Sequence, residues 1–553
     1  MQTDRASLTN ARPDGPRGSG AAELIARGAL LIAVLTALSR LLGLVRTVVF
    51  AQSVGAGCLG TAYVTANTVP NLIYELALGG ALASAMVPVL ARAAGRADQD
   101  EVQKAYVGQV ASALLTWAVV ILLPVTVAIA GLARPIADLL IPANPNATCA
   151  RPAMVGTTTD FIVAFAPQIM LYGVSVVLTG LLQAYRRFTG PTLAPVIGNL
   201  VTITCYLLFA SLDKNLPLAR TPLVAQLVLS IGTTMNIGML VLVALPPTWR
   251  LKLRLRPTLR FPPGVIGKAG GLALVGLLEF AAGDVQGLVT IALANGRGDT
   301  GALVLVNYSS LVFASVCSVL PIAIVTSVFP VLSATDGAVF DRTCAGSTRA
   351  VMLMSWLGTA VIAAVAVPAA HVLAKQPDQV TQLTQAFLLY APGVAGFALI
   401  VGTSRALFAL GRLKAAGIGL VAGPLLQVAV SLPLALLAPP RLVVAALALS
   451  STIALLAVAA PMVFAVRRLR GPAAVAGLGH ATLAGLTAGA IGSAVGVGVT
   501  LAMPAGGKLF EAAVGALAAA LALLAFGVWA YALDRGDLRM VAARLRRFTH
   551  PRS

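Results

Sequence analysis

The run AYVGQVASALLTWAVVILLPVTVAIAG, residues 105–131, contains no charged side chain. About 20 apolar helical residues cross a hydrocarbon core roughly 30 Å thick, so this run is long enough to span a bilayer. It is typical of the chain, because 58% of the 553 residues are hydrophobic, 10% are charged and the mean hydropathy is +0.91. Soluble domains carry roughly 25% charged residues. The composition therefore excludes a soluble protein and indicates an integral membrane protein.

Runs of the same kind recur along the whole chain and predict an all-α polytopic protein with about 14 transmembrane helices. Their hydrophobicity is continuous, whereas the strands of a membrane barrel alternate between apolar and polar residues. The expected spans are 28–50, 60–91, 105–131, 160–185, 191–211, 222–246, 264–294, 302–334, 350–373, 383–411, 415–438, 443–466, 474–503 and 509–533.

The distribution of positive charge predicts how the chain is oriented. Most of its 39 Lys and Arg residues fall in alternate connections between the expected spans. Cytoplasmic loops of membrane proteins carry such an excess of Lys and Arg. We therefore expect a multi-pass membrane protein with both termini in the cytoplasm. The net charge of +20 is then explained without nucleic-acid binding.

Two pairs of similar segments indicate an internal repeat. Val87-Pro88-Val89-Leu90 resembles Phe329-Pro330-Val331-Leu332, and the segment 180–188 resembles 405–413. The partners lie six helices apart, so the two halves cross the membrane in the same direction. This predicts two six-helix lobes related by a pseudo-two-fold axis along the membrane normal.

The expected organisation has five parts. They are a disordered cytoplasmic N-terminus (1–23), an N-lobe of helices 1–6 (24–249), a C-lobe of helices 7–12 that begins with a basic loop (250–470), helices 13–14 (471–534) and a basic cytoplasmic tail (535–553).

Charged residues inside the spans are the candidates for function, because each costs about 2.5–3.5 kcal/mol at a helix centre. Arg40 and Arg46 lie in the first span and Glu75 in the second. An arginine fork suits phosphate oxygens, so we expect Arg40 and Arg46 to bind a phosphate-bearing substrate. The alternative is that Arg40 pairs with Glu75 or Glu279 and locks adjacent helices.

Three further charges each admit two interpretations from the sequence alone. Glu279 and Asp284 in the seventh span form either an ion or proton site or hydrogen bonds between the lobes. Arg405 in the tenth span either serves the same interface or extends to the cytoplasmic surface, as long cationic side chains do.

Cysteine and histidine usage predicts neither a metal site nor a cofactor. The five Cys and three His residues show no ligand spacing, and the chain has no Walker phosphate-binding loop. Cys58 and Cys149 fall in expected external connections, where a disulfide forms readily. Whether they pair is left open by the sequence.

Several motifs carry a resemblance to a known family over nearly the whole chain. They are Ser39-Arg40-Leu-Leu-Gly43-Leu-Val-Arg46, Gly55-Ala-Gly57, Asn67-Thr-Val-Pro70-Asn71-Leu72, Gln183–Phe188 and Arg405–Leu410. In these motifs the chain resembles the MurJ/MviN family, the lipid II flippases of the MOP exporter superfamily. The segment 74–80 is similar to the actinobacterial members of that family.

The resemblance implies a flippase of the bacterial plasma membrane rather than an enzyme. Its substrate would be a peptidoglycan precursor on undecaprenyl diphosphate, moved to the outer leaflet by alternating access without a cofactor. A central cavity would hold the diphosphate, and the residues expected to line it are Arg40, Arg46, Asn71, Tyr74 and Glu75. The expected partners are this substrate, membrane lipids and proteins of cell-wall synthesis.

The chain departs from the family pattern at several cavity positions. Ala62 stands where an acidic residue is usual, Tyr74 where many members have arginine, and Ser310-Leu311 where an Asp-Arg pair is expected. Two alternatives therefore stay beside lipid II transport. One is another exporter of the superfamily, for a lipid-linked glycan or an amphipathic cation, and the other is a non-transporting scaffold for cell-wall assembly.

Overall fold

The computed structural model describes residues 18–76, 100–213, 218–260, 270–319, 321–504 and 506–533. Thirteen helices or helix pairs in these ranges are long and apolar enough to cross a membrane. A further helix, α2 (Cys58–Tyr74), begins the expected second span, whose continuation to residue 91 lies outside the described residues. The all-helical membrane fold predicted from the sequence is confirmed.

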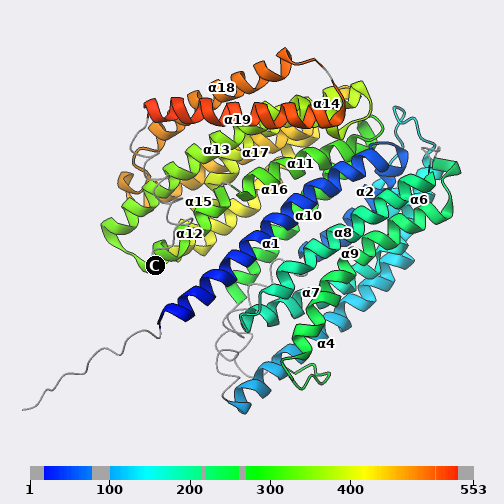
Figure 1. Ribbon diagram of the computed structural model, residues 1–553, viewed down its shortest axis with the longest axis horizontal. Coiled ribbons are helices and arrows are strands. Elements are labelled where there is room, and N and C mark those ends of the chain that lie inside the picture. Colours follow the sequence, from blue (N-terminus) through cyan, green and yellow to red (C-terminus); the bar gives the residue numbers. More distant parts are fainter. Residues whose placement is uncertain are drawn as a thin grey trace, which may run out of the picture.

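The remaining helices follow one another through short connections (Figure 1). They are α1 (Gly18–Ser53), α4 (Glu101–Gly131), α5 (Ala133–Leu140), α6 (Arg151–Phe165), α7 (Pro167–Ala184), α8 (Thr189–Asp213), α9 (Leu223–Trp249), α10 (Gly270–Arg297), α11 (Ala302–Val319), α12 (Pro321–Ala334), α13 (Gly337–Leu373), α14 (Pro377–Tyr390), α15 (Gly393–Ala409), α16 (Leu413–Leu437), α17 (Val443–Arg470), α18 (Leu478–Ala502) and α19 (Lys508–Leu533).

Two expected spans are each divided into two helices at a proline. The breaks lie at Pro167 between α6 and α7 and at Pro392 between α14 and α15. Proline lacks the N–H that continues a helix, and its ring clashes with the preceding turn. Helices also begin earlier than expected in the spans 160–185 and 350–373, where α6 starts at Arg151 and α13 at Gly337.

The helices form two lobes, as the sequence predicted. In the first, α8 packs against α1 and α9, and α7 against α4 and α9. In the second, α16 packs against α10 and α17, and α15 against α13 and α17. Helices α18 and α19 cover α13 at one edge (Figure 1). The half of the internal repeat at residues 87–90 lies outside the described residues, whereas both 180–188 and 405–413 end a helix on the same side.

Small residues explain how closely α18 approaches α13. A Cβ on Gly485 would lie 2.6 Å from the Trp356 ring, and one on Gly496 would lie 2.2 Å from the Cβ of Ala364. Glycine and alanine at such spacings let membrane helices pack backbone to backbone.

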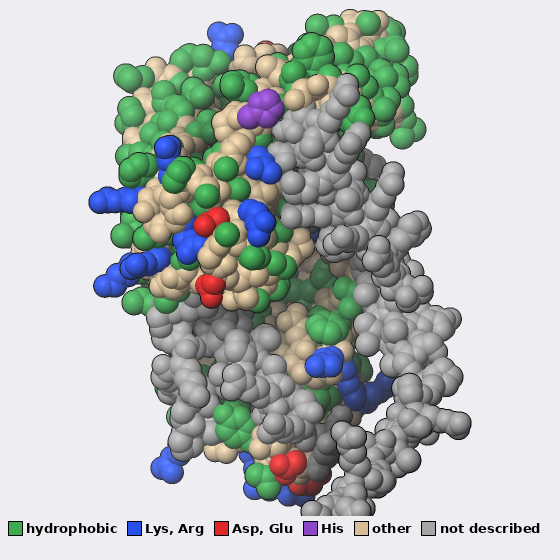
Figure 2. All heavy atoms as spheres, turned by 90° about the vertical axis from the view of Figure 1, so that its left-hand side faces the viewer, with side chains coloured by type: hydrophobic (Ala, Val, Ile, Leu, Met, Phe, Trp, Pro, Cys, Tyr) green, Lys and Arg blue, Asp and Glu red, His purple; other side chains and the backbone are tan. Residues whose placement is uncertain are grey.

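Positive side chains concentrate at one end of the bundle, which we call the inner end. This end holds the α7–α8, α12–α13, α15–α16 and α17–α18 turns and the residues after α9, and we call the opposite end the outer end. Figure 2, viewed from the side on which many of these turns lie, shows Lys and Arg gathered there. The described cations at the inner end are Lys104, Arg186, Arg187, Arg250, Lys252, Arg254, Arg256, Arg260, Arg342, Arg349, Arg412, Lys414, Arg467, Arg468 and Arg470, against seven at the outer end: Arg134, Arg151, Arg220, Arg297, Lys375, Arg441 and Lys508.

Candidate functional site

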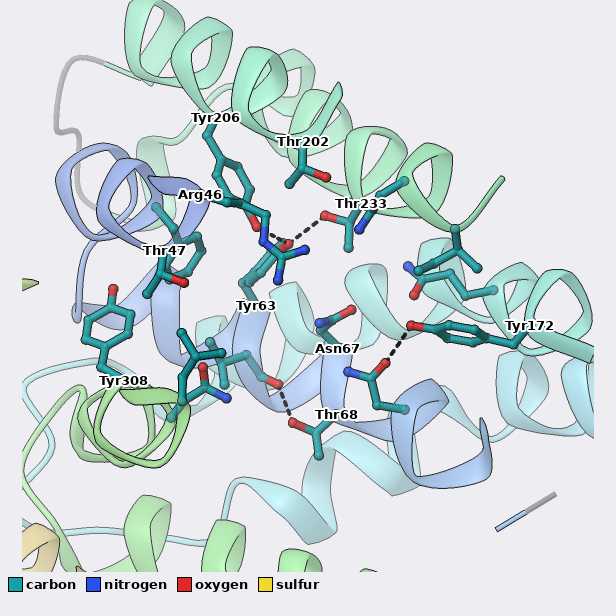
Figure 3. Close-up of a pocket in the computed structure, with 18 residues that line it drawn as sticks. Arg46, Thr47, Tyr63, Asn67, Thr68, Tyr172, Thr202, Tyr206, Thr233 and Tyr308 are labelled. Atoms are coloured by element: carbon teal, nitrogen blue, oxygen red, sulfur yellow. Dashed lines mark hydrogen bonds between the residues drawn. The ribbon is translucent and has the colours of Figure 1, made fainter. Parts of the chain in front are cut away.

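Two adjoining chambers lie between the lobes. The outer chamber, about 320 Å³, is enclosed by α1, α2, α7, α8, α9 and α11 (Figure 3). The inner chamber, about 530 Å³, lies between α1, α7, α8 and α11 and reaches Phe188 in the α7–α8 turn at the inner end. Arg46 and Leu311 line both chambers, so the two adjoin and follow one another from the inner end toward the centre.

Both predicted arginines of α1 line these chambers. Arg40 lines the inner chamber, and Arg46 stands where the chambers meet. Their separation of six residues corresponds to roughly 9 Å along a helix. Within the described ranges, neither guanidinium forms an ion pair with a carboxylate. The alternative in which Arg40 pairs with Glu75 or Glu279 therefore finds no support, and both cations face the chambers.

A cluster of hydroxyl groups lies beside Arg46. The Tyr63 hydroxyl is 2.8 Å from that of Tyr206 and 2.6 Å from Oγ1 of Thr233. Thr233 in turn donates to the backbone oxygen of Leu229. Figure 3 shows the Arg46 guanidinium pointing toward this cluster. The arrangement links α2, α8 and α9 and presents hydroxyl groups next to a positive charge.

Asn71 and Tyr74 are held by the same tyrosine of α7. The Tyr172 hydroxyl donates to Oδ1 of Asn71 over 2.9 Å, and its ring lies 4.2 Å from the ring of Tyr74. Asn71 and Tyr172 line the outer chamber. Tyr74 is not among its lining residues and packs against the ring of Tyr172. At the position where many family members have arginine, this chain therefore has an aromatic contact, that of Tyr74 with Tyr172.

Two of the acidic candidates, Glu75 and Asp284, lie on the lobe boundary rather than around the arginines. A Cβ on Gly287 of α10 would lie 3.2 Å from Cδ2 of Leu72 of α2, so these two helices are in contact. Because the helices run antiparallel, this contact brings Glu75, three residues after Leu72, opposite Asp284, three residues before Gly287. Asp284 is buried, and its Oδ1 accepts no hydrogen bond from the described residues.

The last two candidates lie apart from the chambers. Arg405 is the charged neighbour of Glu279, and its guanidinium lies 5.4 Å from the centre of the Phe329 ring. Arg405 is exposed and borders a small apolar hollow in the second lobe.

The other departures from the family pattern are also explained by their surroundings. Ala62 is fully buried in the core of the outer end, where a carboxylate would meet no water. Ser310 donates to the backbone of its own helix, and Leu311 forms an apolar rim where the chambers meet. The charge lining the chambers is therefore concentrated on α1.

The outer end is closed by contacts between the lobes. Nδ2 of Asn144 donates to the backbone oxygens of both Asn295 and Gly298, each at 2.8 Å, and Asn295 donates to Oγ1 of Thr65. A disulfide between Cys58 and Cys149, with Cα atoms 5.9 Å apart, ties the loop that carries Asn144 to the start of α2. The structure thus answers the pairing question that the sequence left open.

Sequence reasoning missed most of the uncharged lining. These residues are Thr47, Tyr63, Asn67, Thr68, Gln168, Tyr172, Thr202, Tyr206, Thr233, Asn236, Asn307 and Tyr308. A signal was available on α2, where Tyr63, Asn67 and Asn71 recur every four residues and so share one helix face.

Comparison with known proteins identifies the family. A family model described as lipid II flippase MurJ matches residues 50–504. The chain belongs to the MurJ family.

Individual MurJ relatives match over shorter segments. The lipid II flippase MurJ of Burkholderia cenocepacia is 30% identical over 177 residues, which are 32% of this chain and 33% of the relative. The probable lipid II flippase MurJ of Haemophilus influenzae is 40% identical over 80 residues, 14% of this chain and 16% of that protein. The alignments span about a third or less of these relatives.

Solved structures extend the likeness to the whole MurJ fold. A lipid II flippase MurJ in an inward closed conformation superposes with a TM-score of 0.68 at 16% identity, covering 91% of this chain and 99% of that one. An inward-facing multidrug resistance MATE family transporter of the MOP superfamily gives 0.61 at 13% identity, covering 80% and 98%. These likenesses establish the two-lobe transporter fold.

Proposed function

We propose that the chain is a flippase that moves lipid II, a peptidoglycan precursor linked to a polyprenyl diphosphate, from the inner to the outer leaflet. The observation that carries the proposal is that Arg40 and Arg46, which have no carboxylate partner among the described residues, line polar chambers between the lobes of a MurJ-family protein. The diphosphate of the substrate would be the negatively charged partner that neither guanidinium has among the described residues.

The chemistry of the chambers suits a large, hydrated headgroup. Arginine presents a planar and permanently charged fork that matches phosphate oxygens. Asn67, Asn236 and Asn307 line the outer chamber and offer amide groups that hydrogen-bond to sugar hydroxyls and peptide bonds. Since binding and release need no covalent step, the protein acts as a transporter rather than an enzyme.

The mechanism is alternating access between the two lobes. The headgroup enters from the inner end and meets Arg40 before Arg46, because the inner chamber reaches the α7–α8 turn. Separation of the Asn144 contacts then opens the outer end. The excess of positive charge at the inner end supports a cytoplasmic assignment for that end and for both termini. Enzymes of cell-wall synthesis would take up the lipid outside.

The test is rescue of cells depleted of their own lipid II flippase. An external probe that modifies lipid II reports whether the lipid reaches the outer leaflet. We expect rescue by the wild type and loss of rescue by Arg40→Ala and Arg46→Ala at matched membrane levels. Arg468→Ala removes an exposed cation at the inner end of α17 and is the matched control.

The outcomes discriminate between the hypotheses. Failure of a well-inserted wild type to rescue would favour another exporter of the superfamily. Rescue by both arginine variants would instead show that the chambers do not act through these charges.

A further inference from the structure

The segment that follows α9 alternates cations with leucines. It reads Arg250-Leu251-Lys252-Leu253-Arg254-Leu255-Arg256, with Arg260 four residues later. The chain leaves α9 through Lys252, whose φ of +51° and N–H bond to the Trp249 oxygen mark a tight turn. We call residues 252–260 the basic strap. In Figure 1 it belongs to the green trace beyond the end of α9.

The basic strap is attached along α4 by regularly spaced contacts. A Cβ on Gly108 would lie 3.3 Å from the Arg254 oxygen, the Arg256 N–H donates to Oγ of Ser112 over 3.0 Å, and the Thr258 N–H donates to Oγ1 of Thr116 over 3.1 Å. Each step of two strap residues therefore matches one four-residue step of α4. Four helical residues rise about 6.0 Å, and two extended residues about 6.6 Å. The strap is therefore extended and fixed in register on α4.

The two kinds of side chain have different surroundings. Leu251 is buried, and Leu253 packs against the same apolar cluster of α4, α7 and α9. Lys252, Arg254 and Arg256 are exposed. In the described ranges these three cations have no carboxylate partner. A fixed backbone thus holds a row of uncompensated positive charges.

Several features indicate that this row lies at the depth of lipid headgroups. Two of the four tryptophans flank it: Trp249 is 70% exposed, and the Trp117 indole donates to the Leu259 oxygen. Tryptophan concentrates at membrane–water interfaces. Leu255 and Leu259 are also exposed, at 41% and 51%. Exposed leucines among cations suit a membrane surface rather than a soluble anion.

We propose that the basic strap binds the phosphate groups of anionic phospholipids in the leaflet at the inner end. Each cation near an anionic surface strengthens such binding roughly fivefold. Since α4 fixes the strap, its charges are placed before the lipid arrives, and binding does not have to order a flexible loop. This proposal is independent of the transported substrate.

The test measures lipid binding to the purified full chain in detergent. Phosphatidylglycerol and phosphatidylcholine are titrated separately, and bound lipids are counted by native mass spectrometry. We expect the wild type to prefer phosphatidylglycerol and the triple variant Lys252→Gln/Arg254→Gln/Arg256→Gln to bind it at least tenfold more weakly. The control Lys414→Gln/Arg467→Gln/Arg468→Gln removes the same charge from exposed inner-end positions outside the strap and should bind within about twofold of the wild type.

A second variant tests the role of fixation without changing any charge. Ser112→Ala/Thr116→Val removes the two hydroxyl acceptors that hold the strap, and we expect several-fold weaker phosphatidylglycerol binding. The proposal is overturned if the triple variant binds like the wild type, if the control loses as much, or if phosphatidylcholine binds equally well. Wild-type binding by the hydroxyl variant would overturn the claim that α4 positions the charges.

Discussion

Replacing Asn144 by alanine should open the outer end of the cavity. The Asn144 side chain lies in a loop of the first lobe and donates two hydrogen bonds, to the backbone oxygens of Asn295 and Gly298 in the second lobe. Both bonds must break if the lobes separate at this end. The substitution removes them and leaves the Cys58–Cys149 disulfide of the same loop in place.

The size of the effect follows from these two bonds. A neutral hydrogen bond contributes about 1 kcal/mol net, so losing both shifts the balance between closed and open outer ends by about 2 kcal/mol. This corresponds to roughly a 25-fold larger open population. While the open form remains the minor one, the reaction rate of a reporter inside the cavity rises by the same factor.

The assay uses a cysteine at Asn67, which lines the outer chamber, in a chain whose free cysteines are replaced by alanine. A membrane-impermeant maleimide added outside the cell measures how often the outer end opens. Asn146→Ala is the matched control, because it lies in the same loop and only its backbone N–H is bonded. Equal labelling of the Asn144→Ala variant and the parent chain would refute the view that these contacts keep the outer end closed.

Two further predictions concern stability. Tyr63→Phe breaks two buried hydroxyl contacts and should lower the free energy of unfolding by about 1–3 kcal/mol, whereas Tyr308→Phe removes a hydroxyl that has no partner among the described residues and should cost little. Thermal unfolding in detergent measures both, and equal losses would contradict the ranking. At the outer end, burial and the nearby Lys508 ammonium lower the pKa of Lys375 below its ordinary value of 10.5. Because the folded-state pKa is the lower one, charging Lys375 costs stability at neutral pH, and this cost fades as pH rises toward 10.5. Lys508→Gln should therefore raise the midpoint temperature of unfolding at pH 7, and this increase over the wild type should shrink as the pH rises. The control Lys508→Arg keeps the charge and should leave the midpoint unchanged. An increase that does not depend on pH would contradict the role of charge.

The membrane fold was predictable because bilayer thickness and hydrophobicity together determine where helices cross. The breaks at Pro167 and Pro392 were not, since Pro124 and Pro195 lie inside continuous helices of the same chain. Membrane helices tolerate proline where neighbours satisfy the freed backbone groups. Which prolines end a helix therefore depends on tertiary contacts that the sequence does not display.

The candidate site was predictable only where it is charged. Arg40 and Arg46 stand out because a charge inside an apolar span is costly. Tyr63 and Thr233 do not, because uncharged polar residues occur throughout these spans and only the packing of α2, α8 and α9 brings them together. That Arg405, and not Arg40, is the cation whose charge acts on Glu279 likewise depends on which helices face each other.

The most direct measurement of the central claim is translocation by the purified protein in vesicles. Lipid II is incorporated with the protein, and its appearance in the outer leaflet is followed with a reagent that does not cross the bilayer. The account predicts translocation by the wild type and by Arg468→Ala, and its loss in Arg40→Gln/Arg46→Gln. Translocation by the double variant at the wild-type rate, or none by correctly folded wild type, would contradict it.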